Sequence, residues 1–367
     1  MILAAVPAGQ GCIPLPSQSK KLTITQPDDW HLHLRDGDLL ASVVGFSARC
    51  FGRAVVMPNL RPPVTTVESA LRYRERILAA LPAGSGFRPL MTLYLTDHTP
   101  PDEVDRAHAS GIICGLKYYP AGATTHSEAG VTSLTNCFGV LERMEELDLV
   151  LQLHGEATDS DVDPYDREAV FIERELAALV RRFPRLRIVL EHVTTAIGVE
   201  FVHAHGERIA ATLTPQHLLM NRGAMFDGGL RPHLYCLPLL KRERDREALV
   251  AAATGGDPRF FLGTDSAPHE RGAKESACGS AGVFSSHAAL ELYAQAFEKA
   301  GALARLEAFA SHHGADFYRL PRSTGTITLI QGGWTVPGSY RFGRGELVPL
   351  GAGERLAWML LPPDRGS

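Results

Sequence analysis

The chain has 367 residues, of which 45% are hydrophobic and 21% are charged, so it can bury a large core. Its formal net charge is -4, and no basic cluster with interleaved aromatic residues occurs, which argues against nucleic acid as a partner. The six cysteines are dispersed without a C-x-x-C pair. The sequence therefore predicts neither a disulfide framework nor a zinc finger, and it fits a reducing cytoplasm.

We expect the first 20 residues to form an N-terminal extension that is poorly ordered or loosely docked. This segment is mildly apolar, but no basic residue precedes its apolar part, and Pro7, Pro14 and Pro16 interrupt it. A signal peptide needs a basic start and an unbroken apolar stretch, and a membrane span needs about 20 apolar residues. The segment therefore predicts neither secretion nor contact with a membrane.

From about Leu22 to Ala310, short apolar runs alternate with longer amphipathic stretches. The short runs are rich in Val, Ile, Leu or Phe, which is typical of strands that are covered on both faces. The predicted strands are part of Leu22–Leu34, then Arg53–Met57, Pro89–Leu95, Gly115–Tyr118, Val150–His154, Arg187–His192, Arg208–Leu213 and Phe260–Gly263. Apolar residues at three-to-four spacing predict helices over Ser69–Leu81, Asn136–Leu147, Arg167–Arg182, Glu243–Ala253 and Ser286–Lys299.

Eight strands with intervening helices predict an α/β protein of the (β/α)8 barrel type. A doubly wound open sheet is the alternative, but the first strand is not followed by the G-x-G-x-x-G motif of a dinucleotide-binding fold. We expect one barrel domain over residues 21–320. Residues 321–367 are rich in Gly and Pro, and we interpret them as a C-terminal segment that packs on the same domain.

The first predicted strand ends with two histidines, His31 and His33. In a (β/α)8 barrel, catalytic side chains project from the C-terminal ends of the strands. Alternate residues of a strand face the same way, so both imidazoles would point at the mouth of the barrel. Two imidazoles that lie close together can bind one metal ion, although a single H-x-H pair is more often an ordinary surface or core pair.

Four later strands each add one more polar side chain. Lys117 ends the fourth strand, His154 the fifth, His192 the sixth and Asp265 follows the eighth. Taken singly, a histidine here can be structural, and the lysine can extend to the barrel rim. Side-chain packing does not explain why these residues follow one another in this order at the ends of the strands. A metal site at the barrel mouth accounts for all of them, so the sequence predicts a metal centre.

This order of ligands resembles that of the amidohydrolase superfamily of metal-dependent barrel hydrolases. Within it, the chain resembles the bacterial dihydroorotase family from about residue 21 to 320. Tyr118 departs from the family pattern, because leucine is expected there. The resemblance is carried by the stretches Pro27–Gly37, Val56–Leu60, Pro62–Thr66, Thr212–Leu218, Arg231–Pro238 and Gly263–His269.

The resemblance implies two zinc ions per subunit. Lys117 would bridge both ions as an N-carboxylated lysine, together with a hydroxide. An ammonium ~4 Å from a divalent ion would suffer ~8 kcal/mol of repulsion at an effective dielectric constant of ~20, whereas the carbamate is anionic. The other implied ligands are His31, His33 and Asp265 for one ion and His154 and His192 for the second.

The resemblance also implies the reaction, which is the reversible cyclisation of N-carbamoyl-L-aspartate to (S)-dihydroorotate and water in de novo pyrimidine synthesis. A zinc-bound hydroxide would attack the ring carbonyl, since zinc both lowers the pKa of water and polarises a carbonyl group. Asp265 is the implied catalytic residue, which would pass a proton to the leaving ring nitrogen. The family further implies a homodimer.

A second set of residues is implied to bind the substrate. Arg35 would hold its carboxylate, although a salt bridge with Asp36 or Asp38 is the alternative. Residues 120–127 resemble the family's flexible loop, and ordinary turn residues are the alternative for its threonines. The implied contacts are Arg35, Asn59 and His269 to the carboxylate, Leu237 and Ala281 through backbone groups, and Thr124 and Thr125 from the loop.

Two rival functions remain at this point. A hydantoinase or allantoinase of the same superfamily would share the metal ligands, so Arg35, Asn59 and His269 are the residues that discriminate. A catalytically inactive barrel that serves as a scaffold should have lost ligands. Every expected ligand is present in this sequence, which favours an enzyme.

Overall fold

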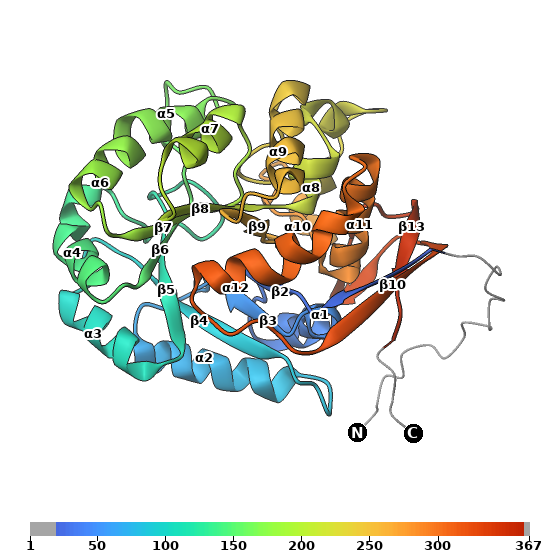
Figure 1. The fold of residues 1–367 in the computed structure, drawn as a ribbon, viewed down its shortest axis with the longest axis horizontal. Coiled ribbons are helices and arrows are strands. Elements are labelled where there is room, and N and C mark those ends of the chain that lie inside the picture. The colour runs from blue at the N-terminus through green and yellow to red at the C-terminus, as the bar shows by residue number, and fades with distance from the viewer. Residues whose placement is uncertain (1–19, 363–367) are drawn as a thin grey trace.

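The computed structural model of the chain describes residues 20–362 (Figure 1). The expected N-terminal extension lies outside the described residues except for Lys20, and so do residues 363–367 of the expected C-terminal segment. Within residues 20–362, every helix is too short or too polar to cross a membrane.

Eight parallel strands form one sheet, in which each strand lies beside the next one in the chain. An isolated bridge joins Leu32 at the end of the first strand to Ser266 after the last, so the sheet closes on itself. The predicted (β/α)8 barrel is confirmed, and the open-sheet alternative is wrong. The strands are β2 (Asp28–Leu32), β3 (Arg53–Val56), β4 (Arg88–Tyr94), β5 (Ile113–Tyr118), β6 (Val150–Leu153), β7 (Arg187–Leu190), β8 (Ile209–Leu213) and β9 (Phe260–Leu262).

The region Leu22–Leu34 divides into two strands that belong to different sheets. Pro27 lies between them and lacks the N–H that would continue a ladder. Only β2 enters the barrel, whereas β1 (Lys21–Thr25) pairs antiparallel with β10 (Thr326–Thr335). Strand β10 also pairs with β13 (Arg355–Leu360), and β11 (Tyr340–Phe342) forms a hairpin with β12 (Gly345–Leu347). The segment after residue 320 thus supplies the strand that pairs with β1.

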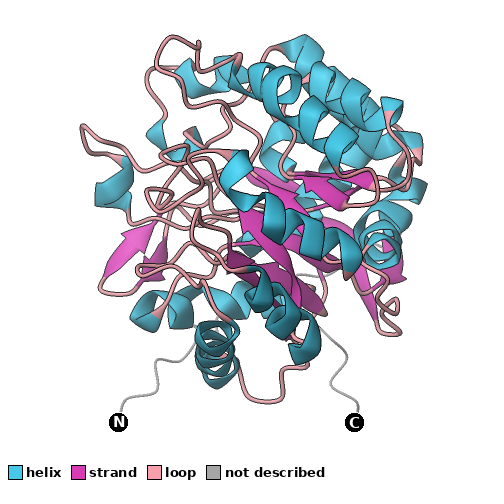
Figure 2. Cartoon of the chain, turned by 90° about the vertical axis from the view of Figure 1, so that its left-hand side faces the viewer, coloured by secondary structure: helices cyan, strands magenta, loops and turns pink. Residues whose placement is uncertain are grey.

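Helices surround the strands, as Figure 2 shows in cyan and magenta. The predicted helix over Arg167–Arg182 is interrupted by a π-helical turn over Ile172–Leu176. The sequence does not predict α1, α3 and α7, nor the short helices α8, α10 and α12, and α3 has few apolar residues that could reveal it. The helices are α1 (Gly37–Cys50), α2 (Val67–Ala80), α3 (Pro101–Ser110), α4 (Phe138–Glu146), α5 (Arg167–Phe171), α6 (Ala177–Arg182), α7 (Ala196–Ala204), α8 (Pro215–Leu219), α9 (Glu243–Gly255), α10 (Arg271–Lys274), α11 (Ala289–Lys299) and α12 (His313–Phe317).

The interior of the barrel is apolar near the start of its strands. Buried side chains such as Trp30, Val150, Val189 and Phe261 fill it there. Trp30 stacks on the ring of Tyr318, with 4.6 Å between the ring centroids. Since this end is packed with apolar groups, polar side chains of the interior must lie toward the C-terminal ends of the strands.

Candidate metal centre

Strand alternation places the polar side chains just beyond the apolar interior. Along β6, Val150 lies in that interior, and Gln152 and His154 follow on the same face. Along β7, Val189 is followed by Glu191 in the same way. All of these side chains are buried. The barrel therefore directs a ring of ionisable groups to one end of its interior.

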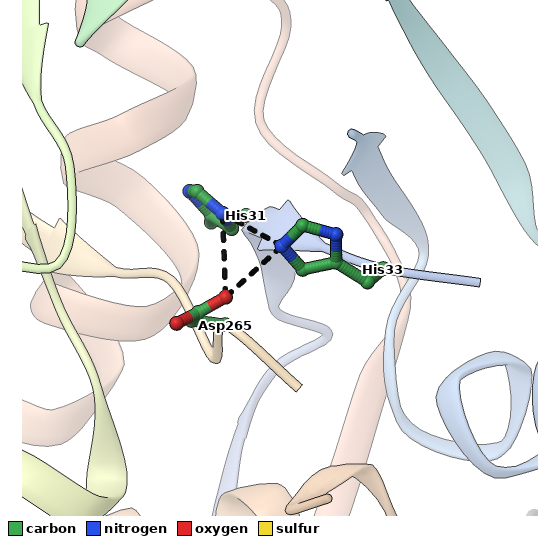
Figure 3. Close-up of side chains that lie close together, drawn as sticks. All are labelled: His31, His33 and Asp265. Atoms are coloured by element: carbon green, nitrogen blue, oxygen red, sulfur yellow. Dashed lines mark hydrogen bonds and ion pairs between the residues drawn. The ribbon is translucent and has the colours of Figure 1, made fainter. Parts of the chain in front are cut away.

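Three of the predicted ligands lie together in one buried cluster (Figure 3). His31 Nε2 lies 3.4 Å from His33 Nε2 and 3.4 Å from Asp265 Oδ1. His33 Nε2 lies 3.1 Å from the same Asp265 oxygen. Imidazole nitrogen and carboxylate oxygen are ligands that zinc prefers. The cluster can therefore hold one metal ion.

The backbone around this cluster is strained, and hydrogen bonds hold it in place. Asp265 has φ 43°, and the same left-handed region contains His192 and Arg35. Such conformations persist at functional sites, where the surrounding structure enforces them. The buried Asp29 carboxylate accepts hydrogen bonds from the N–H of Thr264 at 2.9 Å and from its hydroxyl at 2.6 Å. This contact fixes the last strand against the first.

The two histidines of the cluster are oriented by partners on their other ring nitrogens. His31 Nδ1 donates to Glu191 Oε2 at 2.9 Å, and His33 Nδ1 donates to Asn59 Oδ1 at 2.9 Å. Burial lowers the pKa of both imidazoles, so they are neutral and Nε2 keeps its lone pair. This arrangement is typical of metal-binding histidines.

The second pair of predicted histidines lies next to the first. The His192 ring is 5.0 Å from the His31 ring and 4.8 Å from the His154 ring, measured between centroids. His154 Nε2 donates to Glu156 Oε2 at 2.8 Å, which leaves Nδ1 free to bind a ligand. His192 Nδ1 is buried without a hydrogen-bond partner in the described chain. These imidazoles can therefore complete a second metal site.

Lys117 is completely buried beside these histidines. Its Nζ has no hydrogen-bond partner among residues 20–362, and burial lowers its pKa to about 8. After burial, the charge of Lys117 is the next cause that lowers the pKa of His31. A buried ammonium without a partner is costly, so a modified or metal-bound form of this lysine fits the site better than a free one.

A small pocket opens above the cluster. Lys117 and His269 do not line it, and a larger groove between α8, α9 and α11 lies elsewhere. The predicted residues that line the pocket are His31, His33, Arg35, Asn59, Thr124, Thr125, His154, His192, Leu237, Asp265 and Ala281.

Arg35 enters the pocket as a buried cation. Its Nη2 donates to His269 Nε2 at 2.9 Å, and its Nε donates to the Pro268 carbonyl at 3.0 Å. The salt-bridge alternative is wrong, because Asp36 pairs with Arg76 at 2.8 Å and no described carboxylate pairs with Arg35. Burial lowers the pKa of Arg35 to about 10, so it remains charged at neutral pH. The pocket therefore favours an anionic ligand.

The loop over residues 120–127 crosses the pocket and is attached to two of its walls. The Thr125 hydroxyl donates to the Ala281 carbonyl at 3.2 Å. Asn59 Nδ2 donates to the Thr125 carbonyl at 3.0 Å, while its Oδ1 accepts from His33. The Thr124 N–H is bonded within the loop, to Ser127 Oγ at 2.9 Å. Asn59 thus connects the metal cluster to the loop, besides its predicted contact with a ligand.

Several functional candidates were missed in the sequence. Glu191 and Glu156 each bind the outer nitrogen of a predicted ligand, and Tyr119 lines the pocket. Glu191 stands directly before His192, and alternation after Val189 could have placed it inside the barrel. Its partner His31 is remote in the sequence, so the contact itself could not be predicted.

The chain was compared with known proteins. The amidohydrolase family model matches residues 27–331. The chain is 64% identical over 340 residues to a protein of Laribacter hongkongensis named dihydroorotase, covering 92% of this chain and 99% of that protein. The dihydroorotase structure from Campylobacter jejuni has a TM-score of 0.86 and 37% identity, covering 94% and 99%. An L-hydantoinase from Arthrobacter aurescens shares the fold, with a TM-score of 0.78 but 17% identity, covering 93% and 84%.

Substitution of Glu191 by Gln is expected to weaken metal binding by about 10- to 100-fold, because His31 loses its anionic hydrogen-bond partner. The measurement is a titration of metal-free protein with zinc in the presence of a competing chelator. Glu68→Gln changes an exposed glutamate on α2 and serves as the control. An unchanged zinc affinity of the Glu191→Gln variant would contradict the role of this carboxylate.

Proposed function

The chain belongs to the amidohydrolase family and, within it, to the dihydroorotases, and we propose that it interconverts N-carbamoyl-L-aspartate and (S)-dihydroorotate. This ring closure is the third step of de novo pyrimidine synthesis. One observation carries the proposal: the buried cluster of His31, His33 and Asp265 shares a pocket with the buried cation of Arg35, which pairs with no carboxylate in the described part of the chain. A metal-dependent hydrolase of an anionic substrate needs both features.

We further propose that each subunit binds two zinc ions. His31, His33 and Asp265 would hold one ion, and His154 and His192 would hold the other. The buried and unpartnered nitrogens of His192 and Lys117 support a second ion beside the first. When bound, the ions supply an activated water with a pKa of about 7 and polarise the attacked carbonyl group.

Lys117 is proposed to be N-carboxylated. A neutral amine reacts with carbon dioxide to give a carbamate and a proton, and the lowered pKa of Lys117 makes the neutral amine accessible near neutral pH. The product exchanges a cation for an anion at a place where a cation would repel bound metal. The carbamate would bridge the two ions together with a hydroxide.

Asp265 is proposed to move the proton. In ring opening, its carboxylate takes the proton of the nucleophilic water and delivers it to the ring nitrogen as the C–N bond breaks. In ring closure, it removes a proton from the ureido nitrogen as that nitrogen attacks the side-chain carboxylate, and it returns this proton to the carboxylate oxygen that leaves as hydroxide when the C–O bond breaks. Asp265 Oδ1 lies within 3.1–3.4 Å of two proposed ligands, so it stands beside the reacting atoms.

The substrate carboxylate that does not react is proposed to bind Arg35. This carboxylate persists in both directions of the reaction, and a guanidinium can donate two parallel hydrogen bonds to it. Asn59 and His269 would complete its binding, and Thr124 and Thr125 would close over the ring. Backbone groups of Leu237 and Ala281 would contact the ring itself.

The same carboxylate separates this activity from its nearest rivals. Hydantoin and allantoin rings lack a carboxylate, so they would leave the buried cation of Arg35 without a counter-ion. Low identity to the L-hydantoinase is consistent with this distinction. From the family resemblance we also propose that the protein acts as a homodimer in the cytoplasm.

Purified protein is expected to interconvert dihydroorotate and carbamoyl aspartate, as followed by ultraviolet absorbance. Hydantoin and allantoin should be opened at rates lower by several orders of magnitude, because neither ring satisfies Arg35. Comparable rates on all three rings would contradict the proposed substrate.

Metal analysis is expected to find about two zinc ions per chain, and removal by a chelator should abolish activity. Lys117→Ala removes the proposed bridge, so both the zinc content and kcat should fall steeply. Short carboxylates such as acetate, which can occupy the vacated space as an anion, should restore part of the activity. A Lys117→Ala variant with full zinc content would contradict the bridging role.

Arg35→Met is expected to raise KM and to lower kcat/KM by about 10²-fold or more, because a charge-assisted pair with the substrate is lost. The zinc content should stay at the wild-type value, since Arg35 does not contact the metal cluster. Steady-state kinetics and metal analysis of the same preparation provide the measurement. Near-normal values of KM and kcat/KM would contradict the proposed contact between Arg35 and the substrate carboxylate.

A further inference from the structure

One buried hydroxyl in the pocket has no role in the reaction described above. Tyr119 directly follows β5 and is 1% exposed. Its side chain lines the pocket, but its hydroxyl oxygen has no hydrogen-bond partner among residues 20–362. A buried hydroxyl without a partner destabilises a folded protein, because its hydrogen bonds to water are lost. A bound ligand that forms a hydrogen bond with the Tyr119 hydroxyl would remove this cost.

The ring of Tyr119 is held where it is and cannot turn away to find another partner. It stacks on the ring of Tyr94, with 5.1 Å between the centroids and 30° between the planes. Strand alternation puts Tyr119 on the same face as Lys117, whereas Tyr118 between them belongs to the outer hydrophobic core. The fold thus aims the phenol at the pocket.

Tyr119 lies at the end of the pocket where the chemistry is proposed to occur. Lys117 Nζ is 5.3 Å from the centre of its ring, and the His154 ring is 6.2 Å away. Arg35 and His269, the proposed carboxylate anchor, follow β2 and β9, which lie across the barrel from β5 and β6. The Tyr119 ring therefore lies beside two of the proposed metal ligands, Lys117 and His154, which would flank the reacting carbonyl group of a bound substrate.

We propose that the Tyr119 hydroxyl donates a hydrogen bond to the oxygen of the attacked carbonyl group, and this rests on the proposed function. The carbonyl oxygen gains negative charge as water adds and the tetrahedral centre forms, so the bond strengthens in the transition state. Tyr119 is thus a further catalytic residue, which contacts the reacting atoms without binding metal.

The protonation state of Tyr119 suits this role. The ordinary pKa of a tyrosine phenol is about 10, well above neutral pH. Tyr119 therefore keeps its proton at neutral pH and can donate it in a hydrogen bond. Since the charge develops on the substrate oxygen, no proton needs to be transferred.

The first test is the Tyr119→Phe variant, which removes only the hydroxyl. Its kcat is expected to fall by ~10²–10³-fold in both directions, whereas KM changes by less than about threefold. Zinc content should be unchanged, and the melting temperature should be equal or higher, because an unpaired buried hydroxyl is removed. Tyr118→Phe, at the last residue of β5 and outside the pocket, is the matched control and should resemble the wild type.

The second test measures binding without turnover. A phosphinic-acid analogue of dihydroorotate, with tetrahedral phosphorus at the attacked carbon, should bind at least 10-fold more weakly to Tyr119→Phe than to the wild type. Planar orotate should bind both proteins within about threefold. A kcat within about threefold of the wild type, equal weakening of both ligands, or loss of zinc would overturn the proposal. If the wild type and the Tyr119→Phe variant interconvert dihydroorotate and carbamoyl aspartate equally fast, the role of Tyr119 is wrong but the proposed function still holds.

Discussion

Burial of ionisable groups at the mouth of the barrel is the constraint on which the site depends. Glu191 and Glu156 are buried there, and each accepts a hydrogen bond from a histidine. Lys117 Nζ and His192 Nδ1, which lie beside these pairs, have no hydrogen-bond partner among residues 20–362. Unpaired buried groups are costly, so the arrangement supports the proposed second metal ion and the proposed carboxylation of Lys117.

The proposed ligands come from two opposite parts of the barrel. Strands β5 to β7 carry the lysine and the histidines of the proposed second metal, whereas β2 and β9 lead to the ligands of the first metal and to Arg35 and His269. Residues from both parts line the pocket between them. The loop that bears Thr125 covers this space and is bonded to both Asn59 and Ala281.

Barrel closure gives these positions their rigidity. Asp29 on the first strand binds Thr264 after the last, and His31 and Asp265 flank that contact in the two segments. The left-handed backbone of Asp265 is strained, and the closed sheet maintains it. Groups that move little lose little free energy on reorganisation, which is how a preorganised site stabilises a transition state.

By itself, the sequence determined the barrel and the residue types that end its strands, because apolar runs, strand alternation and helical spacing are local properties. The assignment of Lys117 and the histidines as ligands came from their order together with a family resemblance. Only the tertiary structure decided that β1 pairs with β10 outside the barrel, that Glu191 orients His31, and that the Tyr119 hydroxyl finds no partner among the described residues. Each of these facts depends on segments far apart in the chain, which meet only when the sheet closes and the C-terminal strands dock beside it.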